Sequence, residues 1–96
     1  MGMDLQETRE ELDKLNEKIV DVIEERMELV VDVAKYKERK GKDIVDEDRE
    51  EEVKQEFEDI FQERGLPEGR GRDLAEYLIA TAIDREEEIL DREIDR

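Results

Sequence analysis

Apolar residues recur with a helical period along the first part of this chain. The segment from about residue 4 to about residue 40 contains neither Pro nor Gly. With Leu5 taken as heptad position a, an apolar stripe runs along positions a, d and e. We predict one very long helix over about 4–40, capped by Asp4 and stopped by Gly41. Its apolar a and d residues are Leu5, Leu12, Leu15, Ile19, Val22, Leu29, Val33 and Tyr36.

Two further segments show the same period. A helix over about 47–64 is predicted from one apolar face, with Asp46 or Asp48 as its N-cap and Gly65 and Pro67 at its end. A third helix is predicted over about 70–94, and its apolar run from Leu74 to Ile83 indicates central burial. The apolar face of the second helix consists of Val53, Phe57, Ile60 and Phe61. The sequence thus predicts an all-α fold of three helices in a single domain, residues 1–96.

The length of the first helix predicts an oligomer. A helix of about 36 residues is roughly 54 Å long, whereas a compact chain of this size has a radius of gyration of about 12–13 Å. No monomeric globule covers such a stripe. A second copy of the chain is therefore expected to pack against it, giving a homodimer.

Composition and charge exclude several classes of function. The net charge is −16, which repels duplex nucleic acid and anionic membranes. The chain has no His, Cys or Ser, so disulfides, thiolate chemistry and the commonest covalent nucleophiles are excluded, and no metal site or cofactor is expected. No apolar run is long enough for a membrane span and no signal peptide is visible, so a cytoplasmic location is expected. The excess of acid fits both a salt-adapted and a designed sequence.

Three cations interrupt the apolar stripe. Arg26 occupies an a position, where a buried unpaired guanidinium is costly. Lys37 and Arg9 occupy e positions, and Lys37 lies about three turns from Arg26 on the same side. Arg9 is roughly 25 Å from Arg26 by helical rise, so it joins such a cluster only from the second chain of an antiparallel dimer. The alternative is structural, because polar residues in such seams also fix register and oligomeric state.

Arg49 breaks a second pattern. Residues 46–50 read Asp-Glu-Asp-Arg-Glu, and the acidic residues suit the positive end of a helix dipole. A cation in this first turn is unfavourable unless something pairs with it.

These features resemble the AroQ-type chorismate mutases. The resemblance rests on Thr8–Val20, on Ile23–Leu29, on Val33–Lys37 and on Ile44–Glu50, and it is weaker in the third helix. It implies an intertwined all-helical homodimer with two equivalent sites, each built from both chains.

The resemblance also implies residue roles. Arg26, and Arg9 from the partner chain, would bind substrate carboxylates, and Lys37 would contact the ether oxygen and a carboxylate. Glu50, with the backbone near Asp46, would hold the ring hydroxyl, and Arg49 would order this cluster.

The third helix departs from the family pattern of a Ser followed four residues later by a Gln. A gap-free count from Leu66 places Ala82 and Glu86 at these positions. Ala82 offers no side-chain donor, although Thr81 is adjacent. Glu86 would have to be protonated to donate to the ether oxygen. The alternative for Glu86 is an ordinary solvated acid.

The implied reaction is the isomerisation of chorismate to prephenate in phenylalanine and tyrosine biosynthesis. It needs no nucleophile, metal or cofactor, which matches the missing residue types. Isochorismate pyruvate-lyase, with a similar fold and cation set, is the alternative enzyme, and a non-catalytic helical dimerisation module is the alternative of another class. The module predicts that Arg26 and Lys37 tolerate apolar replacement.

Overall fold

Three helices make up the described part of the chain. The computed structural model describes residues 2 and 4–94, with side chains up to residue 90, so residues 1, 3, 95 and 96 of the expected domain lie outside the described residues. The helices are α1 (Leu5–Lys40), α2 (Glu47–Glu63) and α3 (Glu68–Ile94), and the described residues contain no strand. The prediction of an all-α fold with three helices is confirmed.

Local capping sets both ends of α1. The Asp4 carboxylate accepts a hydrogen bond from the Glu7 N–H at 2.8 Å. At the other end Gly41 adopts a left-handed conformation with φ 64°, which a residue without Cβ reaches at little cost. The Lys42 N–H then donates to the Lys37 carbonyl at 2.8 Å, which closes the helix as a Schellman motif does.

The turn between α2 and α3 is equally local in origin. Gly65 has φ 71°, and the Leu66 N–H donates to the Phe61 carbonyl at 2.8 Å. The carbonyl of Pro67 then accepts from the Arg70 N–H, so α3 begins at Glu68, slightly earlier than the expected start near residue 70. The fixed φ of Pro suits it to a helix start.

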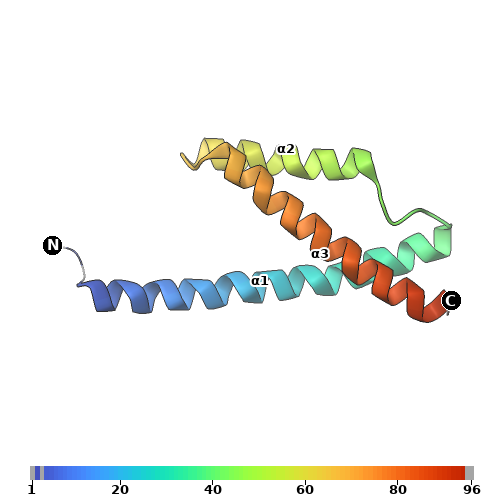
Figure 1. Ribbon diagram of the computed structural model, residues 1–96, viewed down its shortest axis with the longest axis horizontal. Helices are drawn as coiled ribbons and strands as arrows, with labels where there is room; N and C mark the ends of the chain where they lie inside the picture. Colours follow the sequence, from blue (N-terminus) through green and yellow to red (C-terminus); the bar gives the residue numbers. More distant parts are fainter. Residues whose placement is uncertain (1, 3, 95–96) are drawn as a thin grey trace.

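Helix α3 joins the other two helices. It runs diagonally, packing against α2 near its N-terminal end and against α1 near its C-terminal end (Figure 1). In the described part of the chain α1 and α2 do not pack directly on one another. The small core lies along α3 and consists of Val30, Ala34, Val53, Ala75, Leu78, Ile89 and Leu90.

A glycine allows α2 and α3 to cross closely. Gly71 is buried, and a Cβ there would lie 2.7 Å from the Phe57 carbonyl oxygen and 2.8 Å from Phe61 Cγ. Any larger residue would force the two helices apart. The absent side chain therefore sets the distance between α2 and α3.

The heptad stripe of α1 remains uncovered within one chain. Helix α3 buries Val30 and Ala34, whereas the eight apolar a and d residues of α1 are 44–65% exposed. The chain measures 58 × 25 × 17 Å with a radius of gyration of 17.2 Å, well above the roughly 12–13 Å of a compact chain this long. No helix in the described residues is long and apolar enough to cross a membrane.

Candidate functional site

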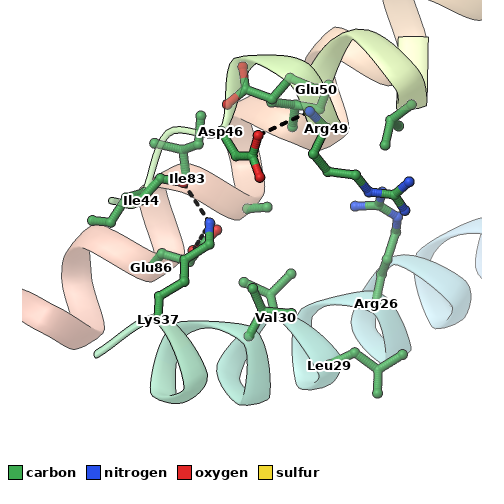
Figure 2. A pocket seen from close by; sticks show the side chains of 14 residues that line it. Arg26, Leu29, Val30, Lys37, Ile44, Asp46, Arg49, Glu50, Ile83 and Glu86 are labelled. Carbon is green, nitrogen blue, oxygen red and sulfur yellow. Dashed lines mark hydrogen bonds and ion pairs between the residues drawn. The ribbon is translucent and has the colours of Figure 1, made fainter. Parts of the chain in front are cut away.

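A pocket of about 350 Å³ opens where the three helices come together. Its floor is the C-terminal half of α1, and the start of α2 and the second half of α3 form its other walls (Figure 2). The lining combines an apolar wall with six charged side chains. The lining residues are Arg26, Leu29, Val30, Val33, Lys37, Ile44, Asp46, Arg49, Glu50, Val53, Ile79, Ala82, Ile83 and Glu86.

Lys37 is held at one end of the pocket by two oxygens. Its Nζ lies 2.8 Å from Glu86 Oε1 of α3 and donates to the Ile44 carbonyl at 2.6 Å. The side chain is only 16% exposed. An ammonium has three donors, and the Ile44 carbonyl takes one of them, so N–H groups remain for a ligand.

Glu86 is the buried acid of the site, with 4% of the residue exposed. Its Oε1 is within ion-pair distance of Lys37 Nζ, yet no donor reaches this oxygen with hydrogen-bond geometry. We therefore describe the contact as a buried ion pair without a well-directed hydrogen bond. A buried oxygen without a donor is costly, which suits a group that exchanges partners when a ligand binds.

Two guanidinium groups face one another at the other end of the pocket. Arg26 extends from α1 and Arg49 from α2, and the two side chains point toward one another (Figure 2). Arg49 Nη1 pairs with Glu52 at 2.8 Å, in an exposed pair on the same helix. Arg26 makes no ion pair among the described residues. An anion between two such cations would offset their repulsion.

The start of α2 brings two acids to the same pocket. Asp46, rather than Asp48, caps the helix, and its carboxylate accepts the Arg49 N–H at 3.1 Å. Glu50 lies one turn further along and is half-buried. This hydrogen bond fixes the orientation of the first turn of α2 at the pocket wall. It thereby also fixes the position of the Arg49 backbone.

The charges of the lining side chains cancel. Arg26, Lys37 and Arg49 are balanced by Asp46, Glu50 and Glu86, three charges of each sign. One chain alone therefore lacks the excess of positive charge that a dianionic ligand needs. No group of three or more acids in the described residues could hold a metal ion.

The pocket collects most of the residues expected from the sequence. Seven line it, namely Arg26, Lys37, Asp46, Arg49, Glu50, Ala82 and Glu86. Thr81 is not among the lining residues, and its hydroxyl donates to the Tyr77 carbonyl at 2.8 Å, one turn back along α3. Arg9 is exposed near the start of α1 and does not line the pocket.

Sequence reasoning missed the Ile44 carbonyl. Its contact with Lys37 depends on the path of residues 41–46 between α1 and α2, and a backbone oxygen leaves no signal in a residue pattern. From the sequence, Val53, Ile79 and Ile83 could be recognised as parts of apolar helix faces. Their position beside the cations in one pocket could not be predicted.

Comparison with known proteins identifies the family. Residues 8–87 match the family model described as chorismate mutase type II. The chain belongs to the chorismate mutase type II family. The matched range includes every pocket residue as well as Arg9 and Thr81. No curated protein and no solved structure matches the chain.

The composition of the pocket is compatible with membership of this family. A chorismate mutase isomerises a small-molecule substrate. The pocket offers cations and apolar walls without a nucleophile. The recognised resemblance of the first two helices thus agrees with the family match.

Proposed function

We propose that this chain is a chorismate mutase that converts chorismate to prephenate in phenylalanine and tyrosine biosynthesis in the cytoplasm. The observation that carries the proposal is the gathering of three cations in one half-apolar pocket, Lys37 at one end and Arg26 with Arg49 at the other. The substrate is a dianion, and Arg26 with Arg49 would bind one of its two carboxylates.

The reaction is a unimolecular rearrangement in which the ether C–O bond breaks while a C–C bond forms. The pocket contributes by holding the folded, reactive conformer and by placing donors where negative charge develops on the ether oxygen. Lys37 is assigned to this oxygen because Glu86 and the Ile44 carbonyl hold its ammonium at this end of the pocket while N–H groups remain to donate. A protonated Glu86 would donate to the same oxygen.

The remaining lining residues orient the ring. Arg26 and Arg49 are assigned to one carboxylate because their guanidinium heads face one another across the pocket. Glu50 is assigned to the ring hydroxyl, together with the backbone near Asp46. Ala82 supplies no donor, so its role is to leave space beside the substrate.

A second copy of the chain is proposed to complete the site. The uncovered a and d stripe of α1 supports this proposal, since an exposed apolar surface of this length is otherwise unfavourable in water. The balanced lining charge gives a second, independent argument. Arg9 of the partner copy would bring the excess positive charge that a second carboxylate requires. The result would be an intertwined homodimer with two shared sites.

Product analysis tests the proposed function directly. Purified chain is incubated with chorismate, and separately with isochorismate, and products are followed by NMR. Prephenate from chorismate at a rate well above the uncatalysed reaction supports the proposal. Pyruvate release from isochorismate alone would instead assign the chain as a lyase. Absence of both activities, with the chain folded and dimeric, would leave only a dimerisation module.

A further inference from the structure

Helix α2 supplies part of the pocket but is attached to only one other helix. Arg49, Glu50 and Val53 of α2 line the pocket, while α2 packs on α3 and not on α1. The position of this wall relative to α1 is therefore set through α3 and through the connecting residues 41–46, where Lys37 binds the Ile44 carbonyl. Contacts that fix α2 on α3 also fix the width of the pocket.

Arg72 of α3 makes such a contact with three charge-assisted hydrogen bonds. Its Nη2 donates to Glu51 Oε1 at 3.0 Å and its Nη1 to Glu51 Oε2 at 3.1 Å, a bidentate fork. Nη1 also donates to Glu58 Oε1 at 3.1 Å. Glu51 and Glu58 both belong to α2 and lie seven residues apart. One guanidinium therefore binds α2 at two points separated by about two turns.

Partial burial and bidentate geometry distinguish this network from an isolated ion pair on the surface. The side chains of Arg72 and Glu58 are 34% and 22% exposed, so water screens this pair only partly, whereas the Glu51 side chain is 59% exposed. Isolated exposed ion pairs contribute little, but bidentate geometry and several charges in one network are the conditions in which they matter. Arg72 also directly follows Gly71, a residue at which α2 and α3 approach closely.

Arg72 itself lies outside the pocket, whereas its partner Glu51 directly follows the pocket residue Glu50. We propose that Arg72 is a positioning residue, which clamps α2 onto α3 at Glu51 and Glu58 and so holds Arg49 and Glu50 at their working distance from α1. This inference rests on the proposed function for its kinetic consequences, but the clamp itself is independent of the substrate.

The clamp predicts a specific kinetic signature. Without it, α2 is correctly placed in a smaller fraction of molecules, and the apparent affinity falls in proportion to that fraction. Saturating substrate restores the assembled wall. Arg72→Met is therefore expected to raise KM by roughly tenfold, below the roughly hundredfold cost of a 1 Å misplacement, with kcat changed much less. High salt should shrink the difference from wild type by screening the clamp.

Arg70 provides a matched control. It lies on the same turn of α3 and pairs with Asp73 at 3.2 Å within that helix, with both side chains largely exposed. Arg70→Met removes the same charge without releasing α2, so its KM should remain near that of wild type. In a Glu51→Gln/Glu58→Gln background, Arg72→Met should have little further effect. Arg72→Lys keeps the charge without the fork and should lie between wild type and Arg72→Met.

Hydrogen exchange of the intact dimer tests the clamp without substrate. Faster exchange of the α2 amides in Arg72→Met, with the α1 amides unchanged and Arg70→Met like wild type, supports the proposal. Equal effects of the two substitutions, or a fall in kcat at unchanged KM, would overturn it. If wild type does not act on chorismate, the proposed function fails, while the exchange comparison still decides whether Arg72 holds α2.

Discussion

Lys37 Nζ of α1 and Glu86 Oε1 of α3 lie 2.8 Å apart in a largely buried ion pair. Arg26, about three turns earlier on α1, has no such partner among the described residues. The two cations therefore differ in what they contribute to folding, although both are assigned to the substrate. The sequence alone does not distinguish Arg26 from Lys37, because both interrupt the same apolar stripe.

This difference predicts opposite effects on stability. Lys37→Met leaves the Glu86 carboxylate buried without its cation, which should lower the free energy of unfolding by about 3 kcal/mol. Arg26→Met removes an unpaired charge and should leave the stability unchanged or raise it. Both should lose about 10²–10³ in kcat, as loss of a transition-state donor does. Thermal melts and steady-state kinetics of the two variants give the comparison.

The double variant Lys37→Met/Glu86→Gln serves as the control. It removes both charges and should recover most of the stability without recovering activity. Near-normal turnover in either single variant would contradict the assigned site.

The second prediction concerns pH. Only the protonated Glu86 carboxyl can donate to the ether oxygen, and an ionised carboxylate would oppose the charge that develops there. Wild-type kcat/KM should therefore be lower where the Glu86 carboxyl is ionised than where it is protonated. Glu86→Gln carries a donor at every pH, so its profile should be flat or higher at neutral pH. Both are measured at fixed ionic strength, and identical profiles would show that Glu86 does not face the reacting oxygen.

The third prediction is complementation between inactive variants. Arg9→Ala and Arg26→Ala homodimers should each be nearly inactive. After mixing and refolding, about a quarter of wild-type activity should return, because random pairing gives half mixed dimers with one intact site of two. Mixed dimers without recovered activity would mean that Arg9 acts within its own chain or not at all.

The fourth prediction concerns the uncovered stripe of α1. Leu15→Glu places a carboxylate on the stripe and should dissociate the dimer at micromolar concentration, as measured by light scattering. Lys14→Glu places the same group one position away, where the wild-type side chain is exposed and pairs with Glu11. It changes the net charge more but should leave the dimer intact. Dissociation by both would point to general repulsion in this acidic chain.

The fifth prediction concerns acid stability. The hydrogen bond from the Arg72 guanidinium lowers the pKa of Glu51 below its ordinary value of 4.5. A lowered pKa in the folded state stabilises the fold above the unfolded value, and this contribution is lost as pH falls through the folded value. The stability difference between wild type and Arg72→Met should therefore persist at neutral pH and shrink below about pH 4.5. Urea unfolding at several pH values measures it, and a constant difference would contradict the pairing.

Much of the fold follows from patterns only a few residues long. The helical period separates three helices, Gly41 and Gly65 mark their ends, and Asp4 begins the first. These features are determined by backbone hydrogen bonds and side chains within one turn, so the sequence alone suffices. The same holds for the anomaly of Arg26, since an apolar period shows where a charge does not belong.

Other features depend on how the helices cross. The heptad pattern does not reveal that α3 covers Val30 and Ala34 and leaves the a and d stripe open. Nor does it show that Lys37 meets both Glu86 and the Ile44 carbonyl, or that the Thr81 hydroxyl is bound to its own helix. These contacts join residues distant in sequence, and the close approach at Gly71 and the path of residues 41–46 decide them. The sequence by itself thus determined the helices and the candidate cations, while the packing of α3 between α1 and α2 decided which of them share a pocket.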